Sequence, residues 1–351
     1  MIINTCKTAD SFKDEEWMKY YVLFHEDLNL KCLPPSNNPL PKLLEVYWNQ
    51  LWKRKEEIGK EYLNASNIHI KSLGRIWEYI QILGSINYIS NDNIVGKKTL
   101  SLGAGVEPNL YIFAKLGAIV NASDIYDSPD YWFPFQLDYL KKNSEIFSQY
   151  ENFQPKINYI HLNLKNRKEL NLLGEYDIIY SISSLEHIYS LFSSKKRLFK
   201  NIVKHLSDDG IFSFTTELII KYDRTINFKR LPIMIRSSLK SRKIDKNAIS
   251  HVSKSYFVNY QGFKLKDLFR KVFVLIYNLS RYNRRYDFFT KEELKAIIKL
   301  LRKKNCYLVD NVNWSSCSKF AIKSDTYKDH YHTSIALTFR KSQKDTFVSY
   351  S

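Results

Sequence analysis

The stretch that decides the fold is Leu100-Ser101-Leu102-Gly103-Ala104-Gly105-Val106-Glu107-Pro108. A short apolar run at 99–102 leads into a turn with two glycines, and a helical pattern follows at 109–116. Gly103 permits a tight turn, and Gly105 lets a ligand approach the backbone because it has no Cβ. The first N–H groups of the following helix lack partners within the helix and add donors at the same place. The stretch therefore predicts a strand, a ligand-binding turn and a helix.

Beyond this turn, predicted strands and helices alternate. Strands are expected at 99–102, 118–122, 157–161, 176–182 and 211–215, and helices at 109–116, 135–150 and 193–206. The rhythm resumes near residue 289 with Thr290 and Glu293 at the spacing of a capping box, a helix to about residue 304, and strands at 307–312 and 333–339. Such alternation predicts an α/β, Rossmann-like, doubly wound sheet with helices on both faces and a ligand at the carboxyl ends of the strands.

The chain divides into three expected parts. Residues 1–95 form an N-terminal leader and helical extension with helices at 40–63 and 72–89, residues 96–221 and 289–341 form the α/β core, and residues 222–288 form a basic helical insert or cap. Of the net charge of +18, most lies between residues 222 and 304, where 22 Lys and Arg face 6 Asp and Glu, a local net of +16. This bias indicates an acidic partner, such as nucleic acid, anionic lipid or a phosphate-bearing substrate; a solvated lysine-rich surface is the alternative.

The cysteines and the apolar runs bear on the compartment. The four cysteines, Cys6, Cys32, Cys306 and Cys317, lie far apart without a CxxC pair, which predicts neither a zinc ribbon nor a disulfide framework and suits a reducing cytosol. The first residues lack the apolar core of a signal peptide, and no run approaches the roughly 18 apolar residues of a membrane span. A cytoplasmic protein is expected, with the basic insert as the candidate for contact with the inner membrane surface.

Asp124 follows the second predicted strand, 21 residues after Gly103. An acid about 20 residues beyond the glycine turn is placed to accept hydrogen bonds from ribose hydroxyls, although it could also be a loop aspartate that begins a turn. A nicotinamide dinucleotide fingerprint would have a third glycine where this chain has Pro108. The spacing therefore favours a ribose-containing cofactor other than NAD.

The segment Tyr176-Asp177-Ile178-Ile179-Tyr180-Ser181-Ile182-Ser183-Ser184-Leu185-Glu186-His187 carries a resemblance. Together with the glycine turn and Asp124, it is similar to the class I S-adenosylmethionine-dependent methyltransferase superfamily over residues 97–217 and the last two strands. The finer match, including Thr215-Thr216-Glu217, resembles methyltransferases of cell-surface polysaccharide gene clusters. The resemblance implies a seven-stranded, mostly parallel sheet with an antiparallel last strand, and S-adenosylmethionine as the cofactor.

The resemblance also implies roles for individual residues. Gly103, Ala104 and Gly105 would border the methionine part of the cofactor, Asp124 would hold the ribose, Ile125 and Asn163 would lie at the adenine, and Ser181 and Ser183 would line the sulfonium end. One departure is Ser101, because relatives often have an acid two residues before the first glycine. Glu107 is the candidate to replace that acid, unless its side chain faces away.

His187 is the candidate general base. Methylation of a hydroxyl requires removal of its proton, and histidine titrates near neutral pH; a histidine that packs the start of the next helix is the structural alternative. Tyr126, Trp132 and Glu217 are weaker candidates for the substrate pocket. His330 and His332 alternate before the last strand without a visible third ligand, so no metal site is expected.

Four functions compete. The favoured one is an O-methyltransferase that acts on a hydroxyl of a sugar, a surface-glycan intermediate or another anionic acceptor, with the basic insert as a cap over the acceptor. An RNA methyltransferase would explain the basic segment, but enzymes that methylate exocyclic base nitrogens resemble one another in an Asn/Asp-Pro-Pro-aromatic run after the fourth strand, which is absent here, as is a catalytic Pro-Cys. A nucleic-acid partner is therefore not expected. A nicotinamide-dependent oxidoreductase and a non-catalytic binding module share the fold and stay open.

Overall fold

The structure is a computed structural model that describes residues 3–7, 11, 14–20, 75–126, 137–142, 144, 153–189, 191–222, 288–312, 314, 317, 322–323 and 330–342. The chain separates into two compact units, Met1–Tyr222 with Tyr286–Ser351, and Asp223–Arg285. The second unit lies outside the described residues, as do the predicted helix at 40–63 and Trp132. The basic insert and its role as a cap therefore stay predictions, and so does the proposed division of the chain.

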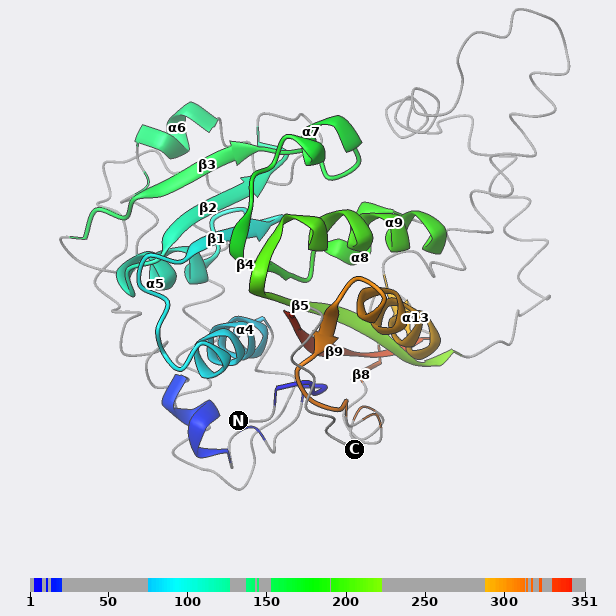
Figure 1. The fold of residues 1–351 in the computed structure, drawn as a ribbon. Helices are drawn as coiled ribbons and strands as arrows, with labels where there is room; N and C mark the ends of the chain where they lie inside the picture. Colours follow the sequence, from blue (N-terminus) through cyan, green and yellow to red (C-terminus); the bar gives the residue numbers. More distant parts are fainter. Residues whose placement is uncertain are drawn as a thin grey trace, which may run out of the picture. The chain divides into compact units, whose positions relative to one another are not determined.

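A mixed sheet forms the centre of the first unit (Figure 1). Its strands follow the order β3-β2-β1-β4-β5-β9-β7. The strands are β1 (Lys98–Leu102), β2 (Ile119–Asp124), β3 (Ile157–His161), β4 (Tyr176–Ile182), β5 (Leu206–Tyr222), β7 (Cys306–Leu308) and β9 (His330–Lys341). β1 to β5 are parallel, whereas β9 runs antiparallel to both β5 and β7. This arrangement confirms the predicted Rossmann-like fold class with its antiparallel last strand.

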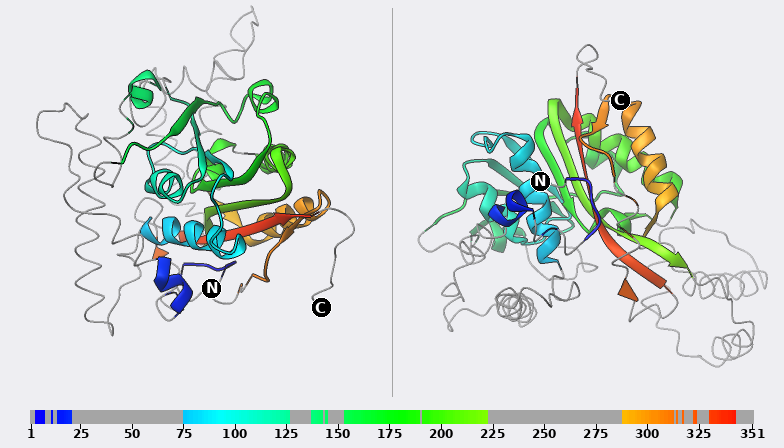
Figure 2. Two further views of the ribbon diagram at one scale, coloured as in Figure 1. Left: turned by 60° about the vertical axis from the view of Figure 1, so that its left-hand side comes forward. Right: turned by 90° about the horizontal axis from the view of Figure 1, so that it is seen from below.

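Helices cover both faces of the sheet. On one face the apolar side chains of α4 (Ile76–Ile89), α5 (Pro108–Lys115) and α6 (Leu137–Lys142) form one core cluster. On the other face α7 (Arg167–Asn171), α8 (Leu185–Ile188), α9 (Phe192–Ile202), the 3₁₀ turn η3 (Val203–His205) and α13 (Lys291–Arg302) contribute to a second cluster. Figure 2 shows α4 in cyan and α13 in orange on opposite sides of β5 and β9. No helix among the described residues is long and apolar enough to cross a bilayer.

The start of α13 shows how local sequence fixes an element. The Thr290 hydroxyl accepts a hydrogen bond from the Glu293 backbone N–H (3.2 Å), and the Glu293 carboxylate accepts one from the Thr290 N–H (2.9 Å). This reciprocal pair confirms the predicted capping box. Leu294, Ile297 and Leu301 then recur on one face and are buried in the second core cluster.

Several elements differ from their predicted bounds. β5 has 17 residues rather than the five expected at 211–215, because its start pairs with β4 and its far end pairs with β9. The two-residue strands β6 (Phe289–Thr290) and β8 (Ile322–Lys323) join β5 and β9 beside the main path, so the sheet has nine strands within the described residues rather than the seven expected. The short helices α7 and α8 were also not predicted. Each of these differences arises from pairing or packing between segments distant in sequence.

The N-terminal segment lies along β9, between the positions of β7 and β8. The Lys7 N–H donates to the Ser334 carbonyl (2.7 Å), and the Ala336 N–H donates to the Thr5 carbonyl (2.9 Å). Between these contacts, Cys6 forms a disulfide with Cys317, although 311 residues separate them. The prediction of no disulfide framework is therefore wrong for this pair, since spacing in the sequence does not report that residues 6 and 317 lie side by side in the fold.

Candidate active site

The glycine turn is fixed to its two neighbouring strands. After β1 ends at Leu102, Gly103 has φ +70° and Gly105 has φ +50°, a region that glycine adopts without steric cost. The N–H groups of Gly103 (2.9 Å) and Ala104 (3.0 Å) both donate to the Ser123 carbonyl of β2. A Cβ at Gly103 would lie 2.6 Å from the Ser184 Cβ, just beyond β4. Glycine is required here by both the backbone and the close approach of Ser184.

Asp124 lies beside this turn at the end of β2. Its Oδ2 accepts a hydrogen bond from the Gly105 N–H (3.0 Å), and its Oδ1 accepts one from the Ile125 N–H (2.7 Å). The side chain is partly exposed. A carboxylate oxygen can accept more than one hydrogen bond, so an acid that holds the turn can also accept from a ligand hydroxyl. A vicinal diol such as that of a ribose fits this arrangement.

The other predicted adenine residue lies next to Asp124. The Leu162 N–H donates to the Asp124 carbonyl (2.8 Å), so the loop after β3 begins beside the end of β2. Asn163 follows, and its Oδ1 accepts a hydrogen bond from the Lys165 N–H (2.9 Å). Ile125 and Asn163 are both partly exposed at this edge. The structure thus brings the predicted ribose and adenine residues to one edge of the sheet.

Glu107 faces inward. Its Oε1 accepts a hydrogen bond from the Ser101 hydroxyl (2.6 Å), so its carboxyl lies beside the position where the resemblance places an acid. Burial raises the pKa of Glu107 to about 8, although the hydrogen bond from Ser101 opposes the shift. The alternative that Glu107 faces away is therefore wrong. The group is a buried carboxyl that is mostly protonated at neutral pH.

The serines after β4 have different partners. The Ser181 hydroxyl is buried and donates to the Leu102 carbonyl of β1 (2.8 Å). Ser183 has φ +45°, an uncommon conformation for a residue other than glycine, and its hydroxyl donates to Oε2 of Glu78 (2.7 Å). Backbone strain of this kind persists where the surrounding contacts fix it, and it is frequent at functional sites.

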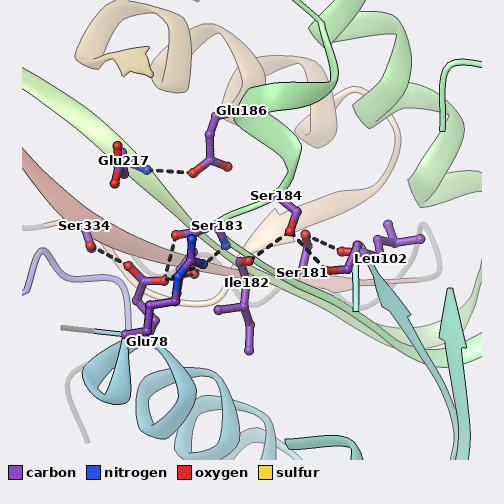
Figure 3. A network of polar contacts seen from close by, with 12 residues as sticks. Glu78, Leu102, Ser181, Ile182, Ser183, Ser184, Glu186, Glu217 and Ser334 are labelled. Atoms are coloured by element: carbon purple, nitrogen blue, oxygen red, sulfur yellow. Dashed lines mark hydrogen bonds and ion pairs between the residues drawn. The ribbon is translucent and has the colours of Figure 1, made fainter. Parts of the chain in front are cut away.

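Three glutamates near the carboxyl end of β4, Glu78 of α4, Glu186 of α8 and Glu217 of β5, are called the acidic cluster below (Figure 3). Glu78 comes from α4 and accepts hydrogen bonds from Ser183, from Thr215 (3.4 Å) and from Ser334 (2.7 Å). Glu186 comes from α8, and its Oε1 accepts a hydrogen bond from the Glu217 N–H of β5 (3.3 Å). The cluster therefore joins segments from a helix before the sheet, the end of β4, and β5.

The acidic cluster is electrostatically unusual. Burial raises the pKa of Glu186, and the nearby His187 opposes that shift. Burial raises the pKa of Glu217 to about 7, and the carboxylates of Glu186 and Glu78 add to the shift. Perturbed carboxyls of this kind concentrate at functional sites, although structural networks can also produce them. No group of three or more His, Cys, Asp or Glu among the described residues has the geometry to hold a metal ion.

The predicted catalytic and pocket residues occupy different environments. His187 is exposed on α8, directly after the buried Glu186. Tyr126 is fully buried, donates its hydroxyl to the Gly105 carbonyl (2.8 Å) and packs edge-on against Tyr159. Its position is that of a support beneath the glycine turn. Glu217 belongs to the acidic cluster, whose other two members were not predicted as site residues.

Comparisons with known proteins concern the fold. No protein-family model matches the sequence, and no curated protein matches it. Magnesium protoporphyrin IX methyltransferase from Synechocystis PCC 6803, solved with bound S-adenosylhomocysteine, is 11% identical, covers 79% of this chain and 90% of its own, and has a TM-score of 0.39. Phosphoethanolamine N-methyltransferase 2 from Haemonchus contortus, solved with S-adenosylmethionine, is 14% identical over 76% of this chain and 52% of its own, with a TM-score of 0.35.

A solved structure described with a different activity has a similar TM-score. A protein from Rhodobacter sphaeroides described provisionally as a zinc-dependent alcohol dehydrogenase is 14% identical, covers 73% of this chain and 89% of its own, and has a TM-score of 0.38. Function has to be argued from the residues of the site, since a fold does not determine it.

Proposed function

We propose that this protein transfers a methyl group from S-adenosylmethionine to an acceptor held at the ends of β4 and β5. The observation that carries the proposal is the bond between the Gly105 N–H and the Asp124 carboxylate, which joins the glycine turn to a partly exposed acid at the end of the next strand. In this proposal Asp124 receives the ribose hydroxyls, Ile125 and Asn163 border the adenine, and the turn from Gly103 to Gly105 borders the methionine part. Bound there, the cofactor supplies an activated methyl group on a positively charged sulfur.

The start of α5 disfavours a nicotinamide dinucleotide. In the dinucleotide arrangement, free N–H groups at the helix start receive the pyrophosphate. Here Pro108 begins α5 and has no N–H, while the Glu107 N–H donates to the Ala104 carbonyl (3.1 Å). Two of the donors that a pyrophosphate needs are thus missing or already used. A sulfonium cofactor without phosphate has no need of them.

For the acceptor, the sequence favours a hydroxyl of a sugar or surface-glycan intermediate, and we keep that class in the proposal. His187 is then the candidate base, because it lies on α8, which follows β4, and is open to solvent. Ser181 and Ser183 fix the backbone at that edge through Leu102 and Glu78. The role of the basic insert as a cap for an anionic part of the acceptor, and contact of that insert with a membrane, belong to the same proposal.

Calorimetry with S-adenosylmethionine, S-adenosylhomocysteine and NADH tests the cofactor. Asp124→Asn should weaken binding of the first two by at least about tenfold, because hydrogen bonds to a charged acceptor are each worth about 1.5–3 kcal/mol. Asp177→Asn is the matched control. Asp177 also accepts a backbone hydrogen bond, from the Lys98 N–H (2.9 Å), but it lies at the start of β4, at the opposite edge of the sheet.

The unfolding temperature of each variant without ligand shows whether the turn survives the loss of the carboxylate. Tight binding of NADH by the folded chain, with no response to S-adenosylmethionine or S-adenosylhomocysteine, would overturn the proposal. Equal weakening by Asp177→Asn and Asp124→Asn would also remove its basis, because a general loss of stability would then explain both.

A further inference from the structure

The acidic cluster contains a buried carboxylate oxygen without a partner. Glu186 is 0% exposed, and its Oε2 has no hydrogen-bond partner among the described residues. The other oxygen, Oε1, is used by the Glu217 N–H. Buried polar atoms in native proteins are almost always hydrogen-bonded, so an orphaned one calls for an explanation such as a ligand. Figure 3 shows the Glu186 carboxylate turned toward Glu217.

Among the described residues, Arg75 and His187 supply the positive charge that acts on Glu186 and Glu217. Within the described part of the chain, the ion pair nearest to it joins Arg75 Nη1 to Glu78 Oε2 at 3.9 Å, and the Arg75 side chain is 41% exposed. His187, next to Glu186, is exposed. Glu186 and Glu217 therefore repel each other and Glu78 in a buried setting, where carboxylates without a paired cation are costly.

We infer that the acidic cluster binds a protonated amine of the acceptor, such as the ammonium group of an amino sugar. The inference rests on the proposed function, because it names the chemistry of the acceptor at the same site. An ammonium group has three N–H donors and no acceptor. It suits the buried Oε2 of Glu186, which has no partner among the described residues, and the carboxyls of Glu217 and Glu78 lie near enough to act electrostatically at the same place. One of those donors would satisfy Oε2 of Glu186.

Other occupants fit less well. A divalent metal ion needs close ligands, and the described residues offer no group of three that could hold one. An anion would add to the repulsion among the carboxylates, so the anionic part of an acceptor would have to lie elsewhere. A neutral hydroxyl would satisfy one carboxylate oxygen and leave the charge uncompensated. A cation with several donors satisfies both the charge and the hydrogen bonds.

Binding of a cation has a measurable consequence for protons. Burial and mutual repulsion raise the pKa of Glu186 and of Glu217, the latter to about 7. A positive charge beside them favours the ionised carboxylates. Protons should therefore leave the protein as the ammonium group enters, at pH values near 7. Other ionisable groups also affect the pKa values of Glu186 and Glu217: Glu78 and Arg75 from the α4 side, and His187 on α8.

The experiment uses glucosamine and N-acetylglucosamine as probes. The two sugars share the ring and differ at one nitrogen, which is a protonated amine in glucosamine and a neutral, larger acetamide in N-acetylglucosamine, so the neutral sugar controls for the ring. Calorimetry with the full chain at pH 7, in buffers of different ionisation enthalpy, gives both the affinity and the number of protons released. Glucosamine should bind at least tenfold more tightly than N-acetylglucosamine and release protons, whereas the neutral sugar should release none.

Glu186→Gln tests the role of the cluster directly. The substitution keeps an oxygen for the Glu217 N–H and removes the charge, so the folded state should be retained. The preference for glucosamine should fall at least tenfold in Glu186→Gln and in Glu217→Gln, and it should persist in Asp177→Asn, which removes a carboxylate at the opposite sheet edge.

The outcomes separate this inference from the proposed function. Equal binding of both sugars by the unmodified chain would overturn the inference, and so would a preference that survives both glutamine variants. Loss of S-adenosylmethionine binding in Glu186→Gln without loss of the glucosamine preference would also overturn it, because the cluster would then serve the cofactor's own ammonium group. Failure of the unmodified chain to bind S-adenosylmethionine would instead refute the proposed function.

Discussion

Replacing Gly103 with alanine tests the geometry of the glycine turn. The residue has φ +70°, and a left-handed backbone conformation costs a residue with a Cβ roughly 1–2 kcal/mol. The added Cβ would also lie 2.6 Å from the Ser184 Cβ and 2.7 Å from its Oγ, and overpacking of this kind costs about 1–3 kcal/mol more. Gly103→Ala should therefore lower the free energy of unfolding by about 2–5 kcal/mol.

Gly96 supplies a matched control. It has φ +71°, but a Cβ there would meet nothing within 4 Å. Gly96→Ala should lower the free energy of unfolding only by the cost of the left-handed backbone, roughly 1–2 kcal/mol. Urea unfolding followed by circular dichroism gives both values, provided that the slope of the transition is unchanged between variants. The difference between the two variants measures the contact with Ser184.

Removal of the Ser184 side chain should relieve the contact. In a Ser184→Gly background the Gly103→Ala change should cost no more than Gly96→Ala, and the difference is the coupling energy of a double-mutant cycle. Ser184→Gly alone has its own cost, because the Ser184 hydroxyl donates to the carbonyls of Gly103 (3.2 Å) and Ile182 (3.0 Å). Equal losses for Gly103→Ala and Gly96→Ala in the unmodified chain would refute the described approach of the two segments.

Three further predictions follow from other parts of the structure. Thr290→Ala should cost about 1 kcal/mol in urea unfolding and Thr290→Ser much less, because serine keeps the oxygen that caps α13. Since burial raises the pKa of Glu217 from 4.5 to about 7, the folded state binds that proton more tightly, and the stability is present below pH 4.5 and lost as pH rises through 7. Relative to Glu217→Gln, the unmodified chain should lose about 3 kcal/mol between pH 4.5 and 7.5, and parallel pH curves for the two proteins would contradict this. His187→Ala should lower turnover by about 100-fold or more with little change in S-adenosylmethionine affinity, whereas unchanged turnover would assign His187 a structural role.

The sequence predicted the part of the fold that depends on local pattern. Short apolar runs and the glycine turn located β1, β2, β3 and β4 to within about two residues, and the spacing of Thr290 and Glu293 located the start of α13. The length of β5 could not be predicted in this way. Asp208 and Asp209 lie inside the strand at an irregularity between Leu206 and Ile211, which both pair with β4, and pairing with β9 extends the strand from Ile211 onward. Pairing partners, rather than local propensity, set its ends.

The sequence predicted the cofactor half of the site better than the acceptor half. Gly103, Gly105 and Asp124 belong to a turn and the next strand, and their spacing is itself informative. Glu78 gave only a weak signal, an acid in an otherwise apolar helical pattern that is 4% exposed in the structure. Its partners Ser183 and Ser334 lie 105 and 256 residues further along the chain, so only the folded sheet brings them together. Glu186 was visible beside His187, but the pattern did not show which of the two faces inward.

Asp124 connects the stability of the site with its proposed use. Its carboxylate fixes the Gly105 N–H and the following Ile125 N–H in the chain as it stands, so the turn is held in place by the same group that would receive the ribose. The Tyr126 hydroxyl donates a hydrogen bond to the Gly105 carbonyl, so both backbone polar groups of Gly105 are held. A ligand that binds to a turn already held in this way does not have to order it. The binding free energy is therefore not reduced by the entropy cost of ordering the turn. The buried Tyr126 and the partly exposed Asp124, two positions apart in the sequence, thus both bond to Gly105 and hold it ready for a ligand.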